Sequence, residues 1–150
     1  MKRPKFSHLD PRGEARMVDV SKKPIQTRRA IAEAVMRCAP ATMKLLRASA
    51  LPKGDALAVA RVAGIQAAKR TAELIPLCHP LPLHQAGVTF ELLDDRIVIR
   101  AEALTDARTG VEMEALTAAA VAGLALYDML KSADKELVIE GIRLISKTKK

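Results

Sequence analysis

The sequence predicts an α+β fold in which helices cover an antiparallel sheet, and three observations support this prediction. The chain has 150 residues, the length of one ordinary domain. Two alternating, β-branched runs, "AGVTFELL" and "RIVIRAEAL", are separated only by Asp94 and Asp95, which is typical of an antiparallel hairpin. Stretches with apolar residues at three- and four-residue spacing lie on both sides of this hairpin and indicate helices. We therefore expect one domain, residues 1–150, with a flexible segment over residues 1–15.

The chain before the first long helix is predicted to contain a strand and two helices. Apolar residues alternate over residues 17–20, which suits a short strand. The segment "TRRAIAEAVMR", residues 27–37, has apolar residues at helical spacing and is followed by Pro40, so we expect a helix that ends there. Another short helix is expected near residues 42–48.

The segment "KGDALAVARVAGIQAAKRTAELI", which starts at Lys53, strongly indicates a helix. Asp55 is suited to its N-cap, and small residues such as Gly64 permit a close approach of a neighbouring backbone. The prolines that follow remove backbone donors and fix φ, which excludes further helix: Pro76, Pro80 and Pro82. The segment "IPLCHPLPLHQ" is therefore predicted to be extended.

The remaining elements complete the predicted topology. A long helix is expected over residues 111–131, and "ELVIEGIRLIS" is expected to return as a strand. The resulting order is strand, helices, strand, strand, helix, strand. This is the split βαβ pattern of ferredoxin-like α+β folds, in which helices cover an antiparallel sheet.

The charge of the chain indicates an anionic partner. The net charge is +8 and the sequence pI is about 9.8, values that suit nucleic acid, an acidic membrane surface or a phosphorylated small molecule. Aromatic residues, on which single-stranded nucleic acid stacks, are only 2% of the chain. The composition therefore favours a basic pocket for phosphates over a stacking surface for RNA.

The distribution of apolar residues and cysteines indicates a cytoplasmic protein. The N-terminal stretch lacks the apolar core of a signal peptide, and no apolar run approaches the length needed to cross a bilayer. Cys38 and Cys78 are far apart in sequence and are expected to be reduced thiols.

Two carboxylates near the start of the last helix, Glu112 and Glu114, are candidates for a functional site. Thr109 and Glu112 fit a capping box, so Glu112 has an ordinary structural interpretation. Glu114 has none, and it lies about 200° around the helix from Glu112. The two side chains are therefore expected to share a site only at the N-terminal end of the helix.

Charged residues at two other helix ends leave two interpretations open. Asp128 and Lys131 lie three residues apart, which suits either a surface ion pair or an acid and base pair. Lys53 precedes a helix, where a cation opposes the helix dipole, so this position hints at an anionic ligand.

The proline-rich segment first suggests a metal site or a thiol nucleophile, and both interpretations are weak. Cys78 and His79 are adjacent, and His84 is the only other candidate ligand nearby. These are too few ligands for a zinc site. No base and orienting partner can be identified for Cys78. The sequence also lacks the glycine-rich signatures of phosphate-binding loops, so an anion site would be built from side chains.

Several long blocks of the sequence resemble one known family. The blocks are "MVDVS", "KGDALAVARVAGIQAAKRTAELIPLCHPLPL", "TGVEMEALTAAAVAGLALYDMLK" and "IRLISK". They are similar to the MoaC proteins, the cyclic pyranopterin monophosphate synthase family of molybdenum cofactor biosynthesis. The resemblance covers nearly the whole chain.

This resemblance implies a lyase that acts on a cyclised dihydro-GTP. It implies conversion of (8S)-3',8-cyclo-7,8-dihydroguanosine 5'-triphosphate to cyclic pyranopterin phosphate and diphosphate, with no metal or organic cofactor. It also implies a ferredoxin-like fold and a homohexamer, a trimer of dimers, with active sites at subunit interfaces. Neither nucleic acid nor a membrane is then expected as a partner.

The resemblance also implies roles for individual residues. Three match the family's proton-transfer set: Asp128, Lys131 and Lys53. Those that match its substrate-contacting segments are Leu77, Cys78, His79, Met113 and Glu114, with Glu112 on the purine-derived portion. Those suited to the triphosphate are Arg28, His79 and Lys147. Gln26 departs from the family pattern, which has a threonine two residues before the arginine.

Two alternatives from other classes remain. A basic nucleotide- or RNA-binding module that kept the scaffold but lost activity would bind RNA with steep salt dependence and form no product. A purely structural oligomer is the third interpretation, but a scaffold has little use for so many titratable groups at element ends.

Overall fold

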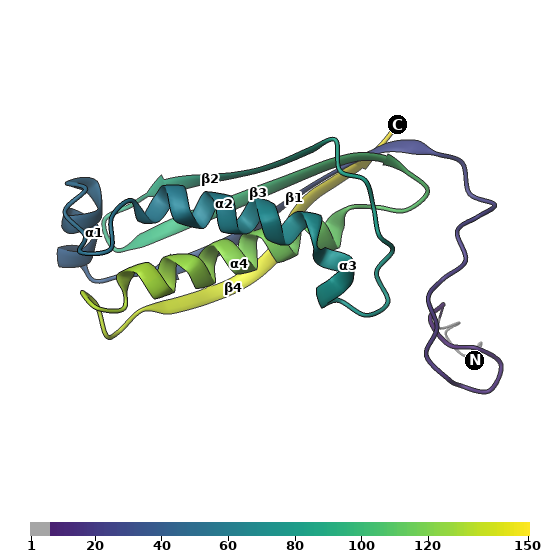
Figure 1. The fold of residues 1–150 in the computed structure, drawn as a ribbon, viewed down its shortest axis with the longest axis horizontal. Coiled ribbons are helices and arrows are strands. Elements are labelled where there is room, and N and C mark those ends of the chain that lie inside the picture. The colour runs from purple at the N-terminus through teal and green to yellow at the C-terminus, as the bar shows by residue number, and fades with distance from the viewer. Residues whose placement is uncertain (1–6) are drawn as a thin grey trace.

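The computed structural model describes residues 7–150, in which one layer of helices lies on one face of a four-stranded antiparallel sheet (Figure 1). The elements in chain order are β1 (Gln26–Arg37), α1 (Pro40–Arg47), α2 (Ala56–Lys69), α3 (Thr71–Leu74), β2 (Gln85–Leu92), β3 (Arg96–Ala107), α4 (Glu112–Leu130) and β4 (Val138–Lys149). The strand order is β2-β3-β1-β4. The predicted α+β class and its split βαβ topology are confirmed.

The helix predicted over residues 27–37 is wrong, because this segment is strand β1. It pairs with β3 on one side and with β4 on the other. Every second side chain of the strand is buried under the helices: Ala30, Ala32, Ala34 and Met36. Alanine favours helices intrinsically, but hydrogen bonding to two neighbouring strands outweighs that preference.

The short strand predicted over residues 17–20 is also wrong. This segment is extended but lies outside the sheet, and it projects from one end of the molecule (Figure 1). The carbonyl of Val18 accepts a hydrogen bond from His79 Nε2 at 2.7 Å. Side chains of the domain therefore hold the segment, and the first strand of the fold is β1.

The other predicted elements are confirmed. Asp55 caps α2, since its Oδ1 accepts a hydrogen bond from the amide of Ala58 at 3.0 Å. The short helix α1, the β2–β3 hairpin, α4 and β4 lie close to their expected positions. The proline-rich segment makes a turn at residues 75–78 and then runs extended to β2.

Helices α2 and α4 pack closely through small residues. A Cβ atom at Gly64 would lie 2.8 Å from the carbonyl oxygen of Ala118 and 2.8 Å from a methyl group of Val88. By length and composition α4 is apolar enough to cross a membrane, but 56% of its most apolar window is buried inside the protein. That burial is typical of a helix in a protein core.

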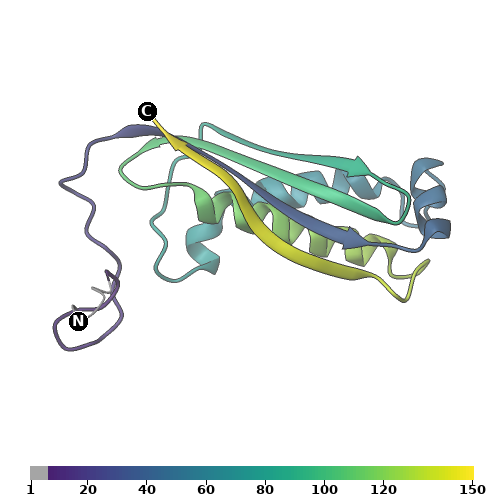
Figure 2. The ribbon, with the colours of Figure 1, turned by 180° about the vertical axis from the view of Figure 1, so that it is seen from behind.

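No element of residues 7–150 covers the opposite face of the sheet (Figure 2), and charged side chains of the strands lie on this face. Glu33 is buried there and binds two guanidinium groups, Arg100 at 3.1 Å and Arg143 at 2.7 Å. These pairs join β1 to both of its neighbouring strands.

Candidate active site

Three residues predicted to transfer protons meet at the C-terminal end of α4. Lys53 Nζ donates to the carbonyl of Asp128 at 2.7 Å and lies 3.1 Å from its Oδ2. Lys131 Nζ lies 2.7 Å from Asp128 Oδ1. We call Lys53, Asp128 and Lys131 the lysine–aspartate cluster. Asp128 thus compensates the charge of Lys53, which lies before the start of α2.

The cluster has defined protonation states at neutral pH. Hydrogen bonds from Lys131 and Lys53, together with their positive charges, lower the pKa of Asp128 below its usual value. The Asp128 carboxylate in turn raises the pKa of Lys131. In the free protein Asp128 is therefore a carboxylate and Lys131 an ammonium group, and both side chains are partly exposed to solvent.

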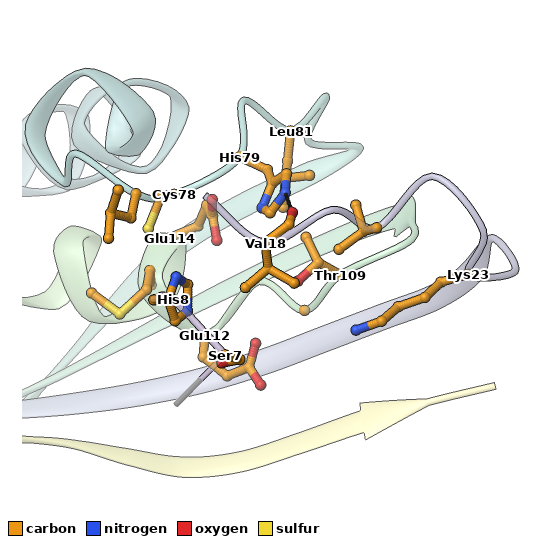
Figure 3. Close-up of a pocket in the computed structure, with 14 residues that line it drawn as sticks. Ser7, His8, Val18, Lys23, Cys78, His79, Leu81, Thr109, Glu112 and Glu114 are labelled. Atoms are coloured by element: carbon orange, nitrogen blue, oxygen red, sulfur yellow. Dashed lines mark hydrogen bonds between the residues drawn. The ribbon is translucent and has the colours of Figure 1, made fainter. Parts of the chain in front are cut away.

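The predicted substrate-contacting residues gather at the other end of α4, around a cavity of about 410 Å³ (Figure 3). Those that line it are Leu77, Cys78, His79, Glu112, Met113 and Glu114. We call it the carboxylate cavity, after its two glutamates. Its wall combines apolar side chains with these carboxylates, so it suits a flat ring system that carries N–H donors.

Glu114 is 4% exposed, and its burial raises its pKa to about 7. The negative charge of Glu112 contributes to the same shift. Burial and the Glu114 carboxylate also raise the pKa of the Cys78 thiol, so Cys78 is not activated as a nucleophile. Glu114 therefore exchanges its proton near neutral pH, which lets this residue donate as well as accept.

Glu112 behaves differently from Glu114. Burial by itself would raise its pKa, but its own backbone amide, the Lys147 ammonium 3.0 Å away and the charge of Arg28 lower it below the usual value. The predicted capping box is wrong, since α4 begins without a side-chain cap. The Glu112 carboxylate binds Lys147 because β4 passes the N-terminal end of α4.

A second cavity of about 270 Å³ adjoins the first one. Arg28, Arg29, Lys147 and Lys149 line it, and Gly110 and Glu112 belong to both cavities. We call it the basic cavity. Arg28 Nε is buried without a hydrogen-bond partner among the described atoms, while its Nη2 donates to Gln26 Oε1 at 3.0 Å. Gln26 thus orients Arg28.

The two predicted sets are far apart within one chain. Asp128 follows Glu112 by sixteen residues on α4, which is about 24 Å at the rise of an α-helix. The structure brings Arg28 and Lys147 together in the basic cavity, whereas His79 lines the carboxylate cavity. Within one chain the two predicted groups of residues therefore occupy separate places at the two ends of α4.

Comparison with known proteins identifies the family. Residues 17–150 match the model of the MoaC family. The chain belongs to the MoaC family.

Curated relatives of this MoaC-family protein carry the name cyclic pyranopterin monophosphate synthase. The relative from Nostoc sp. (strain PCC 7120 / SAG 25.82 / UTEX 2576) is 54% identical over 147 residues, which cover 95% of this chain and 86% of the relative. The relative from Thermomicrobium roseum is 56% identical over 144 residues, 95% of this chain and 87% of the relative. The relative from Chloroflexus aggregans is 54% identical with the same coverage.

In this MoaC-family protein the structure adds residues that sequence reasoning missed. The carboxylate cavity is also lined by residues from the segment before β1: Ser7, His8, Val18, Val20 and Lys23. Residues 1–6 lie outside the described part, but residues 7–16 form a compact turn. The turn-forming residues of "HLDPRG" were the available signal for it.

Proposed function

We propose that the protein is a cyclic pyranopterin monophosphate synthase. It converts (8S)-3',8-cyclo-7,8-dihydroguanosine 5'-triphosphate to cyclic pyranopterin phosphate and diphosphate in molybdenum cofactor biosynthesis. The observation that carries this proposal is the set of relatives of that name, which are 54–56% identical over 95% of the chain. The residues that the sequence predicted to be functional also gather near the two ends of α4.

The two adjoining cavities suit the two ends of such a substrate. The guanine-derived ring has N–H donors, and the carboxylate cavity offers acceptors on Glu112 and Glu114. The triphosphate needs cations, and the basic cavity offers Arg28 and Lys147. Arg28 and Lys147 also stabilise the negative charge that develops on departing diphosphate.

The lysine–aspartate cluster moves the protons. Opening the guanine ring, closing the pterin ring and forming the cyclic phosphate all require protons to leave some atoms and reach others. Asp128, held as a carboxylate, is the acceptor, and Lys131, held as an ammonium group, is the donor. Lys53 balances the charge of Asp128 as these protons move.

We further infer that neighbouring subunits share each active site. The cluster of one subunit lies about 24 Å from its own cavities, so a second copy has to supply the missing group. Exposed apolar side chains of α4, Leu124 and Tyr127, lie beside the cluster and suit a contact between copies. A homohexamer built as a trimer of dimers meets this requirement. The free thiols Cys38 and Cys78 fit a cytoplasmic location.

Turnover of the cyclised nucleotide tests this proposal. Purified protein should release diphosphate and the pyranopterin, and Lys131→Ala and Lys53→Ala should each lower kcat by at least about 100-fold. Lys44→Ala, which removes an exposed lysine of α1, is the matched control and should keep the wild-type rate. The proposal fails if wild-type protein forms no product in an assay in which a named relative does. Salt-dependent RNA binding without product would then favour the inactive module.

A further inference from the structure

Residues 7–16 form a small hairpin at the edge of the carboxylate cavity, which we call the N-terminal hairpin. Its backbone bonds join Arg16 N to His8 O at 2.8 Å and Asp10 N to Glu14 O at 2.9 Å. The Asp10 carboxylate closes the turn by accepting from the amides of Arg12 and Glu14 at 2.8 and 2.9 Å. The hairpin is therefore held by its own bonds and presents His8 from an ordered turn.

Two side chains of the domain tether the chain that follows the hairpin. His79 Nε2 donates to the carbonyl of Val18 at 2.7 Å. Arg108 Nη1 donates to the carbonyls of Ser21, at 2.7 Å, and Lys23. These bonds keep the N-terminal hairpin beside the cavity, where Ser7 and His8 contribute to its wall.

His8 is placed to contact whatever fills the carboxylate cavity. Figure 3 shows its ring among Glu112, Glu114 and Val18. His79 also lines the cavity, but its Nε2 is already bound to Val18. Within residues 7–150 the His8 ring makes no side-chain hydrogen bond, so its N–H is available to a ligand.

We propose that the N-terminal hairpin is the outer wall of the substrate site and that His8 donates a hydrogen bond to an acceptor atom on the ring end of the substrate. This inference rests on the proposed function. A guanine-derived ring carries N–H donors together with a carbonyl acceptor. The Glu112 carboxylate only accepts hydrogen bonds, and Glu114 donates one only in its protonated form. The imidazole ring of His8 carries an N–H in every protonation state, so His8 supplies the donor for the acceptor atom. The hairpin also shields the ring end from water.

Binding without turnover tests this role of His8. In a Lys131→Ala background, the cyclised nucleotide is titrated calorimetrically, and His8→Ala is expected to raise its Kd about tenfold, the effect of losing one hydrogen bond to a ligand. His8→Asn, which keeps an N–H donor, should recover part of the affinity. His84→Ala is the matched control, because His84 is 54% exposed and faces Asp106 outside the cavity; it should leave Kd unchanged.

Kinetics and amide exchange separate a ligand contact from a merely structural role. With Lys131 intact, His8→Ala should raise KM about tenfold and leave kcat within about twofold. Amide hydrogen exchange over residues 8–16 should slow when the cyclised nucleotide is added to the Lys131→Ala protein. Asp10→Ala, which loosens the hairpin but keeps His8, should raise KM as well.

The possible failures are distinguishable. If wild-type protein forms product while His8→Ala shows unchanged KM and Kd, the inference about the hairpin is wrong and the proposed function stands. Unchanged exchange over residues 8–16 with bound nucleotide would overturn it too. If wild-type protein neither binds nor converts the cyclised nucleotide, the proposed function and the inference both fall.

Discussion

At the scale of single residues, Glu112 and Glu114 show how environment sets the chemistry of identical side chains. Both lie in the first turn of α4. Glu112 has the Lys147 ammonium and the Arg28 charge near it, and its pKa is lowered, whereas burial raises the pKa of Glu114 to about 7. Near neutral pH the first is therefore a fixed acceptor and the second can exchange a proton.

The raised pKa of Glu114 predicts a pH-dependent stability difference. The pKa of this carboxyl group is near 4.5 in the unfolded chain and about 7 in the folded protein. The folded state therefore binds the proton more tightly, and the free energy of unfolding falls as pH rises through this interval. Glu114→Gln, which resembles the protonated acid, should therefore raise the free energy of unfolding by less than about 1 kcal/mol at pH 5 and by about 3 kcal/mol at pH 8. Denaturant unfolding at the two pH values measures this difference.

Glu112→Gln is the control for Glu114→Gln, and the opposite sign is expected. Because the pKa of Glu112 is lowered in the folded state, its charge stabilises the protein above the unfolded pKa and that stability is lost as pH falls. Glu112→Gln should thus destabilise the protein at pH 8 and do so less in acid. A pH-independent effect of Glu114→Gln would show that burial does not hold its proton.

At the scale of elements, the contact between α2 and α4 depends on Gly64. Its helix passes so close to α4 that a Cβ atom would meet backbone at Ala118. Gly123 of α4 differs, since a Cβ atom there would only make ordinary contacts at 3.5 Å with Ile139 and Ile99. Two glycines in helices of one layer therefore have different constraints.

Alanine substitutions at these two glycines should have opposite effects. Gly64→Ala should lower the free energy of unfolding by about 1 to 3 kcal/mol, because the added methyl group overpacks the helix contact. Gly123→Ala should raise it by up to about 1 kcal/mol, the helix preference of alanine over glycine. Denaturant midpoints of the two variants measure the difference, and similar effects at both positions would contradict a specific close approach at Gly64.

At the scale of the whole molecule, the two ends of α4 hold the two halves of the proposed chemistry. The lysine–aspartate cluster lies at one end and the cavities at the other, about 24 Å apart. A site shared between subunits therefore predicts complementation between variants that lack different halves.

Mixed assemblies of Lys131→Ala and Arg28→Ala test this sharing. Each variant alone should be nearly inactive, whereas equal amounts allowed to exchange subunits should recover about one quarter of the wild-type activity, because one neighbouring pair in four combines an intact cluster with an intact cavity. The pyranopterin assay measures the recovery, and native mass spectrometry verifies the exchange. Exchanged but inactive mixtures would place both halves of the site in one chain.

Local signals in the sequence determined most elements, whereas the candidate site residues were implied by the resemblance to the MoaC family. Alternation with β-branched residues marked the β2–β3 hairpin, Asp55 marked the start of α2, and the prolines marked the extended segment. The Asp128–Lys131 pair also followed from sequence, because three-residue spacing on a helix places the two side chains together.

Only the tertiary structure decided the features that depend on distant segments. Residues 27–37 became β1 because β3 and β4 offer hydrogen bonds on both sides, which no local pattern records. Contacts between distant segments also place Lys53 beside Asp128 and Lys147 beside Glu112. They likewise bring His8 into the wall of the carboxylate cavity. A sequence determines local preferences through backbone sterics and periodicity, whereas pairing, burial and the resulting pKa values arise only when residues far apart in the chain come into contact.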